Sequence, residues 1–169
     1  MWAADNQAFT RGFDPGRFFP WLEMMRPYRA RCLFVVCPDA PGDRVATRQL
    51  WERWSPCLAD WPLAYVAQDG ETDIPRGAQT LFLGGKRMVP GRLEWKRSQQ
   101  AADLIQLALR RGLHVHIGRV NWGAAYRHFQ LMRGSETFTC DGTRTRWDGR
   151  ETTLRAWNNY QLQTPLLRL

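Results

Sequence analysis

The chain has 169 residues and a formal net charge of +8, and 44% of its residues are hydrophobic and 12% aromatic. This composition supports a packed core and excludes a disordered chain, and the length favours a single domain over residues 1–169. No apolar run approaches the roughly 18 residues of a membrane span, and Met1–Asp5 lacks the basic and apolar stretches of a secretory signal. We therefore expect a cytoplasmic protein without a membrane partner.

Short apolar runs alternate with helix-like stretches along the chain. The apolar runs are nearly uninterrupted, as is typical of parallel strands that are buried on both faces. In chain order, we predict a strand at Trp2–Asp5, a helix around Pro15–Met25, a strand at Cys32–Cys37, a helix at Asp43–Trp54, strands at Leu63–Ala67 and Thr80–Leu83, a helix at Ser98–Arg111, a strand at Leu113–Ile117, a helix at Trp122–Arg133, a strand at Thr137–Cys140 and a last helix at Glu151–Tyr160.

This alternation predicts an α/β fold with a parallel sheet and right-handed crossovers. The chain holds about six βα units, whereas a complete (β/α)₈ barrel usually needs about 200 residues or more. We expect either a compact or incomplete TIM-type (β/α) barrel or an open, doubly wound sheet. Both architectures bind ligands at the carboxyl ends of their strands.

Polar residues and glycines follow several of the predicted strands. Three strands are followed by a carboxylate, one by an amide and one by a glycine pair, and these residues are Asp5, Asp39, Asp141, Gln68 and Gly84-Gly85. A glycine pair lets a flat ligand approach the backbone closely. Aspartate and glycine also favour loops and helix caps, which is enough to explain Asp43 and Asp69.

Other kinds of site find little support. The chain has no GxGxxG, GxxxxGK[ST] or GxSxG motif. Its four cysteines form no CxxC pair and no zinc-type spacing with histidine, which fits a reducing compartment. His114 and His116 share one face of a predicted strand but lack a third ligand, so we interpret them as packed or hydrogen-bonding histidines rather than metal ligands. We expect neither a metal nor a cofactor.

The positive charge comes almost entirely from arginine, because the only lysines are Lys86 and Lys96. A GC-rich genome would explain this bias, and so would a surface that contacts phosphates, since guanidinium groups match phosphate geometry. The arginines are spread along the chain, so the charge permits a nucleic-acid partner without establishing one. Trp95 and Trp122, in loops near strand ends, are candidates for stacking on a base.

Six motifs at strand ends carry a resemblance to a known family. In order, they are CLFVVCPDAPGD, YVAQDG, LFLGG, EWK, HVHIGRVN and CDGT. Together they make the chain, from about Trp2 to Thr143, similar to bacterial and phage transglycosylases that place 7-deazaguanines in DNA. It is similar also to the tRNA-guanine transglycosylases of queuosine synthesis. The resemblance implies a (β/α) barrel that replaces guanine in DNA with a preQ0-like base through a covalent aspartate intermediate.

The resemblance also implies roles for individual residues. Asp141 looks like the nucleophile that attacks C1′, and Asp5 like the carboxylate that carries the proton of the leaving or incoming base. Asp39 would accept from N1–H and the 2-amino group of guanine, while Gln68 and the Gly84-Gly85 backbone would face its O6 edge. Further substrate contacts are expected at Gly118, Arg119 and Asn121, and contacts to the nucleic acid at Lys96, Arg144 and Arg146.

General chemistry agrees with these roles. Base exchange with retention needs two carboxylates, which stand about 5–5.5 Å apart in the analogous glycosidases. A base in DNA must also be flipped out or single-stranded before it can react. The chain departs from the family pattern at Phe138 and Gln7, which replace an aspartate and a glycine, and by an insertion at Lys86–Leu93. The zinc-binding cysteines of the tRNA enzymes are missing, which favours the DNA-type branch.

Two other functions remain open on the sequence. A barrel remnant could bind a purine or a nucleic acid without catalysis, or the same carboxylates could serve a glycosidase in which water replaces the incoming base. The sequence also leaves open whether the nucleic-acid substrate is DNA or RNA. An exposed sheet edge would give the chain reason to form a homodimer or to bind a partner protein.

Overall fold

The structure is a computed structural model that describes residues 1–85, 95–120, 138–141 and 151–152. The chain divides into two compact units, Met1–His116 and Ile117–Leu169, and each is described by itself. The predicted helix at 122–133 and the insertion at 86–93 lie outside the described residues. Of the predicted last helix, only Glu151 and Thr152 are described, and both are helical.

The described elements follow the predicted alternation closely. The strands are β1 (Trp2–Ala4), β2 (Cys32–Val36), β3 (Leu63–Ala67), β4 (Thr80–Leu83), β5 (His114–Ile117) and β6 (Phe138–Cys140). The α-helices are α1 (Ala8–Arg11), α2 (Pro15–Met24), α3 (Arg44–Trp54) and α4 (Gln99–Arg110), and 3₁₀ turns occupy η1 (Arg26–Arg31), η2 (Ser55–Leu58) and η3 (Trp95–Arg97). All six predicted strands and the three longer helices that fall on described residues are confirmed, with ends that differ by about one residue. The helix α1 and the 3₁₀ turns were not predicted.

The strands are hydrogen-bonded in the order in which they occur in the chain, β1-β2-β3-β4-β5-β6. The pairs β1–β2, β2–β3 and β3–β4 are parallel. A doubly wound sheet would reverse its strand order around a central strand. The sheet is instead wound in one direction, as in an incomplete (β/α) barrel, and this order excludes the open doubly wound alternative for the described strands.

The longer helices of the first unit begin at side-chain caps. Asp14 accepts a hydrogen bond from the N–H of Gly16 (2.9 Å) at the start of α2, and Asp43 accepts from Ala46 (3.0 Å) at the start of α3. Ser98 accepts from Ala101 (3.2 Å) at the start of α4. Each cap satisfies an N–H group that would otherwise lack a partner in the first turn. Asp43, predicted as a cap, is confirmed in that role.

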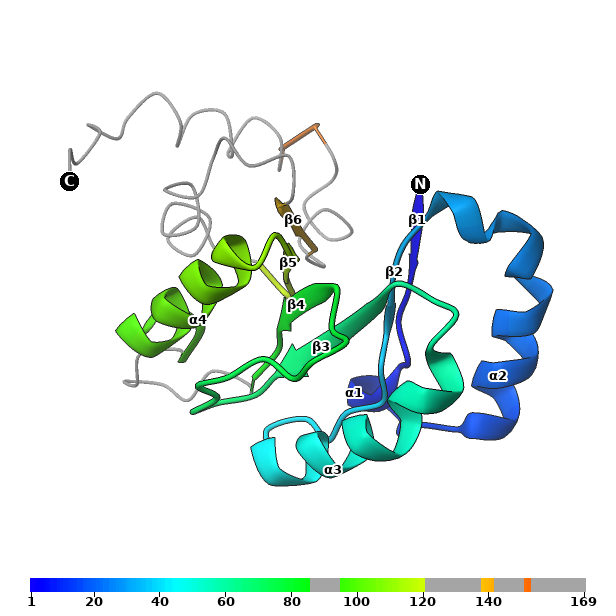
Figure 1. Cartoon of the computed structure of the whole chain (residues 1–169), viewed down its shortest axis with the longest axis horizontal. Helices are drawn as coiled ribbons and strands as arrows, with labels where there is room; N and C mark the ends of the chain where they lie inside the picture. The colour runs from blue at the N-terminus through cyan, green and yellow to red at the C-terminus, as the bar shows by residue number, and fades with distance from the viewer. Residues whose placement is uncertain (86–94, 121–137, 142–150, 153–169) are drawn as a thin grey trace. The chain divides into compact units, whose positions relative to one another are not determined.

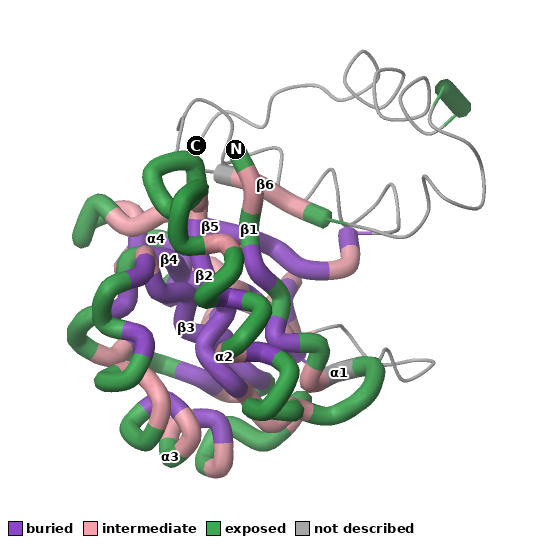
Figure 2. The backbone as a smooth tube through the Cα atoms, turned by 90° about the vertical axis from the view of Figure 1, so that its right-hand side faces the viewer, coloured by how far each residue is buried: buried purple, intermediate pink, exposed green. Residues whose placement is uncertain are grey.

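The core fills both faces of the sheet in the first unit. On the face toward α3, the Trp51 ring packs edge-on against Tyr65, with 5.5 Å between their centroids. On the opposite face, Phe34, Val36, Ala64 and Val66 form a buried cluster against which Phe82 packs. Most of β2 and all of β3 are therefore buried (Figure 2), and α2, α3 and α4 lie around the strands of this unit (Figure 1). Burial on both faces explains the uninterrupted apolar runs.

The two histidines of β5 belong to the cluster around Phe34. The ring of His116 lies 5.0 Å from Phe34 and 4.6 Å from Phe82, and the ring of His114 lies 5.9 Å from Phe34, all between centroids. The interpretation of both as packed histidines on one face is therefore confirmed.

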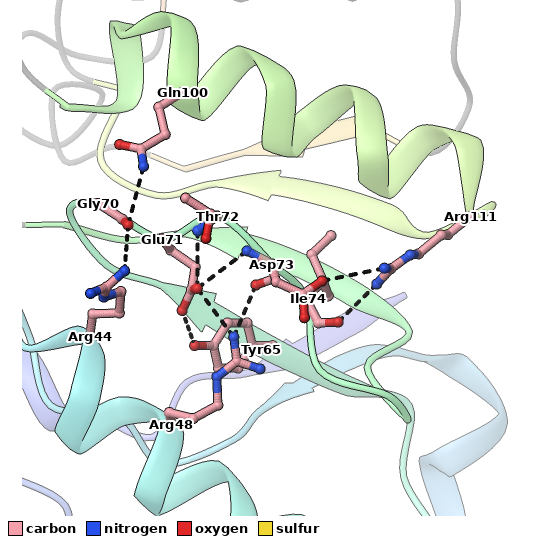
Figure 3. A network of polar contacts seen from close by, with 10 residues as sticks. All are labelled: Arg44, Arg48, Tyr65, Gly70, Glu71, Thr72, Asp73, Ile74, Gln100 and Arg111. Atoms are coloured by element: carbon pink, nitrogen blue, oxygen red, sulfur yellow. Dashed lines mark hydrogen bonds and ion pairs between the residues drawn. The ribbon is translucent and has the colours of Figure 1, made fainter.

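A polar network centred on Glu71 fixes the connection between β3 and β4 (Figure 3). Glu71 is buried and accepts hydrogen bonds from the Tyr65 hydroxyl and from the guanidinium of Arg48 (3.2 Å). Its Oε1 also accepts from the N–H groups of Thr72 (3.1 Å) and Asp73 (3.3 Å). Because these donors satisfy the buried carboxylate, the connection is held against β3 and α3.

Helices α3 and α4 both contact this connection close to the end of β3. The Gly70 carbonyl accepts from Arg44 of α3 (3.0 Å) and from Gln100 of α4 (3.3 Å). Farther along, Arg111 donates to the Ile74 carbonyl (2.8 Å) (Figure 3). The backbone that follows Gln68 is thus tied to two helices.

Among the described residues, no helix is both long enough and apolar enough to cross a membrane.

Candidate functional site

The carboxylate of Asp39 lies at the centre of the candidate site, just after β2. Its Oδ1 accepts a hydrogen bond from Asn6 Nδ2 (2.9 Å), and its Oδ2 accepts from Gln68 Nε2 (2.8 Å). Burial raises the pKa of Asp39 above its ordinary value, the two amide donors oppose this rise, and the negative charge of Asp5 adds to it. One amide thus orients each oxygen, and each oxygen keeps acceptor capacity for a further donor.

Gln68 supports Asp39 from the end of β3. Its side chain is fully buried, and its Oε1 accepts from the N–H groups of Gly42 (2.7 Å) and Gly85 (3.3 Å). Because the oxygen faces two backbone donors, the Nε2 group must face Asp39. Gln68 therefore joins the loops that follow β2 and β4 to the end of β3.

Gly84 and Gly85 are required by the packing at the end of β4. A Cβ at Gly84 would lie 2.6 Å from Val66 Cγ1, and Gly85 has a φ of +106° that disfavours any side chain. The Gly84 N–H donates to the Ala67 carbonyl (3.0 Å), and the Gly85 N–H donates to Gln68. The N–H groups expected to face a base therefore already have acceptors within the protein, and Gly85 is buried beside the side chains of Asp69 and Trp95.

Asp5 and Asn6 form the turn after β1. Asp5 is exposed, and its Oδ1 accepts from the N–H of Gln7 (3.0 Å), which has a left-handed φ of 58°. Asn6 is buried; its Oδ1 accepts from Ala8 N–H (2.8 Å), and its Nδ2 donates to the Cys37 carbonyl (2.9 Å) as well as to Asp39. A pocket of 370 Å³ opens beside this turn, lined by residues of the turn and of α2. An exposed carboxylate on a fixed turn can exchange protons with a ligand.

Lys96, expected to contact a nucleic acid, lies in η3 and is only 2% exposed. Its neighbour Trp95, considered as a stacking platform, is half-buried and donates from its indole N–H to Gln100 (3.3 Å). An ammonium group inside the fold is better placed to support neighbouring protein groups than to lie along an open phosphate backbone.

In the second unit, Asp141 follows β6 and its side chain is exposed. Its carboxylate accepts from the N–H of Arg119, which has a left-handed φ of 58°. Its backbone N–H donates to the Ile117 carbonyl (3.2 Å), and its carbonyl accepts from Val120 (2.7 Å). The segment containing Gly118 and Arg119 therefore orients an exposed carboxylate.

The structure brings together part of the predicted set. Asp5, Asp39, Gln68 and the glycine pair come from the carboxyl ends of β1 to β4 and lie in the first unit, whereas Gly118, Arg119 and Asp141 lie in the second. Asn121, Arg144 and Arg146 lie outside the described residues. Asn6 was missed, although its position beside Asp5 at a strand end was a signal for it.

Within the described residues, no group of three or more histidine, cysteine, aspartate or glutamate side chains could hold a metal ion. Comparison of the chain with protein-family models, with curated proteins and with solved structures found no match.

Proposed function

We propose that this protein is a transglycosylase that replaces guanine in DNA with a 7-deazaguanine base, through a covalent bond between Asp141 and the sugar. The observation that carries the proposal is the way in which hydrogen bonds hold the carboxylate of Asp39. Amides hold both of its oxygens at the edge of the sheet where parallel strands bind ligands. A carboxylate with acceptor capacity left on both oxygens matches the adjacent N1–H and 2-amino donors of guanine or a 7-deazaguanine.

The neighbours of Asp39 hold its carboxylate in place. Gln68 donates to Asp39 and accepts from the N–H of Gly85. Gln68 is fixed by two backbone donors, so the acceptor pair is set before a ligand arrives. Preorganisation of this kind lowers the entropic cost of binding.

The chemistry would run as a double displacement. A carboxylate oxygen of Asp141 attacks C1′, the bond from C1′ to the base nitrogen breaks, and Asp5 gives a proton to the departing guanine. The incoming 7-deazaguanine loses its proton to Asp5 and attacks C1′, which breaks the ester bond and frees Asp141. The hydrogen bond from the Arg119 N–H would orient that carboxylate for the attack.

The proposal extends to the polymer and to the rest of the fold. The net charge is +8 and nearly all positive side chains are arginines, which suits a nucleic-acid substrate. The reacting nucleotide must leave its stack to reach the site. Arg144 and Arg146, which follow Asp141 in the sequence, are the residues we propose for the flanking phosphates. We further propose a compact or incomplete TIM-type barrel that works in the cytoplasm on DNA, with RNA as the alternative polymer.

A base-exchange assay tests the proposal. The protein is incubated with guanine-containing DNA, and in parallel with tRNA, together with labelled preQ0, and the label in each polymer is counted. We expect label in DNA, none with Asp141→Asn, and unchanged incorporation with the control Asp103→Asn, which alters an exposed carboxylate on α4. Full activity of Asp141→Asn would exclude Asp141 as the nucleophile.

A second candidate is a purine-binding protein without catalysis. It is favoured by the location of Asn6, Asp39 and Gln68, which complete the recognition group within the first unit without any residue of the second. Saturable binding of preQ0 or guanine with no label in either polymer would support this candidate. Release of free guanine without incorporation would instead identify a glycosidase.

A further inference from the structure

Asn6 is the one residue of the described site that contacts both the turn carrying Asp5 and the carboxylate of Asp39. It is 5% exposed, and both of its long-range hydrogen bonds end on residues 31 to 33 positions farther along the chain. Its oxygen accepts from Ala8, which closes the turn that begins at Asp5. The end of β1 and the end of β2 are therefore joined through a single amide.

The geometry uses nearly all the hydrogen-bonding capacity of this side chain. An asparagine amide offers two N–H donors and one oxygen, and here the donors go to the Cys37 carbonyl and Asp39, while the oxygen goes to Ala8. Aspartate has the same shape but no donor, so it would leave two acceptors unpaired and set a second carboxylate against Asp39. Serine is too short to reach all three partners.

We infer that Asn6 is a positioning residue that holds the base-binding carboxylate of Asp39 and the proton-transferring turn of Asp5 in one fixed arrangement. This inference rests on the proposed function, because the roles of Asp5 and Asp39 come from it. The donor from Asn6 also opposes the effect of burial on Asp39 and so favours its ionised form. Loss of Asn6 would therefore impair recognition of the base and proton transfer together.

The first experiment does not depend on activity. The carboxyl carbon of Asp39 is titrated by NMR in the full-length protein, in Asn6→Ala and in the isosteric Asn6→Asp, with Gln49→Ala on the exposed face of α3 as the control. We expect the pKa of Asp39 to rise in both Asn6 variants and to stay unchanged in the control. Asn6→Ser, with a short polar side chain, replaces the alanine variant if that variant fails to fold.

The second experiment measures base exchange over a range of pH. We expect kcat/KM of Asn6→Ala to fall roughly 10- to 100-fold, the usual effect of losing a hydrogen bond to a charged group. We also expect the acid limb of the pH profile to move to higher pH. In the Asp39→Ala background, Asn6→Ala should change KM little further, whereas it should still lower kcat through the turn of Asp5.

The two experiments separate the failure of the inference from that of the proposed function. One outcome would overturn the inference and leave the proposed function standing. In it, the wild-type protein exchanges bases, and the Asn6 variants show the same pKa of Asp39 and the same pH profile as the wild type. A wild-type protein without exchange would overturn the proposed function, and a raised pKa of Asp39 in the same variants would still support the coupling of the two strand ends through Asn6.

Discussion

At the scale of single residues, the carboxylate of Asp39 should make binding of the base depend on pH. Burial raises its pKa, and only the ionised form can accept two donors from a base. Binding of preQ0 should therefore weaken as the pH falls, starting at a higher pH than an ordinary aspartate would give. Calorimetric titrations between pH 4 and pH 8 measure this effect. Asp39→Asn should bind preQ0 at least about tenfold more weakly than the wild type at pH 8, and its affinity should not change with pH. If the affinity of the wild type stayed unchanged down to pH 4, Asp39 would not be the group that binds the base.

Gly84 provides a prediction that separates packing from backbone strain. Gly84→Ala places a methyl group 2.6 Å from Val66 Cγ1, so we expect a loss of about 1–3 kcal/mol in the free energy of unfolding. The shift of the neighbouring Gly85 should also weaken binding of the base, because Gly85 donates to Gln68. Urea denaturation and calorimetry measure the two effects.

Gly77→Ala is the matched control for this change. Gly77 has a φ of +86°, and its added Cβ would meet no atom within 4 Å, so only backbone strain of about 1–2 kcal/mol is expected. Its affinity for the base should be unchanged. Equal effects of the two variants on affinity would show that Gly84 has no special connection to the site.

The sequence was informative about residues whose role is local. Asp43 could be predicted as a cap because a cap bonds to its own helix, and Asp39 was singled out because it directly follows a strand. The role of Asn6 depends on partners 31 to 33 residues away, and the burial of Lys96 depends on the packing around η3. Such roles are set by tertiary contacts, which no local pattern contains.

At the scale of elements, the connection between β3 and β4 depends on the hydroxyl of Tyr65. Burial and the nearby Glu71 raise the pKa of Tyr65, so it stays protonated and donates to that carboxylate. Tyr65→Phe removes this donor and should cost about 1–3 kcal/mol of stability, since a buried charge loses a partner. Hydrogen exchange should speed up at Thr72 and Asp73, whose N–H groups bind Glu71.

Tyr28→Phe provides the comparison, because Tyr28 is 56% exposed. Its stability and exchange rates should match those of the wild type. Equal exchange rates at Thr72 and Asp73 in Tyr65→Phe and in Tyr28→Phe would show that the network does not hold the connection.

The longer elements could be predicted because periodicity, caps and breakers agree with one another. Ser98 and Gly112 bracket α4, and the buried strands read as unbroken apolar runs. The 3₁₀ turn η1 (RPYRAR) has no hydrophobic period, and α1 is only four residues long, so neither leaves a pattern that a prediction can use. Glu71 was missed because a buried glutamate can be recognised only once its donors are in place.

At the scale of the whole molecule, the stability of the fold should depend on pH through His114 of β5. Burial, and to a lesser extent the charge of His116, lower the pKa of His114 below its ordinary value of 6.5. The unfolded chain therefore binds a proton at a higher pH than the folded chain. Stability should decrease as the pH falls below about 6.5, down to the lowered pKa of the folded state.

Urea denaturation at pH 8 and pH 5 measures this decrease. His114→Phe keeps a ring beside Phe34 and removes the titrating group, so its midpoint should fall less between the two pH values than that of the wild type. Identical decreases in the two proteins would mean that other groups cause the pH dependence.

The fold class could be predicted, but the choice between two architectures could not. A doubly wound sheet and an incomplete barrel share the same alternation of strands and helices, and they differ only in which strands are neighbours. Neighbour relations appear in the pairing order β1-β2-β3-β4-β5-β6 and not in the periodicity of any segment.

That pairing order also bears on how the chain folds during synthesis. Each strand pairs with the strand made just before it, so β1 to β4 can assemble within the first 83 residues. Pairing of consecutive strands keeps these contacts shorter in sequence than the reversed strand order of a doubly wound sheet would. The turn of Asn6, the loop of Asp39 and the end of β3 can thus come together while the segment carrying Asp141 is still being translated.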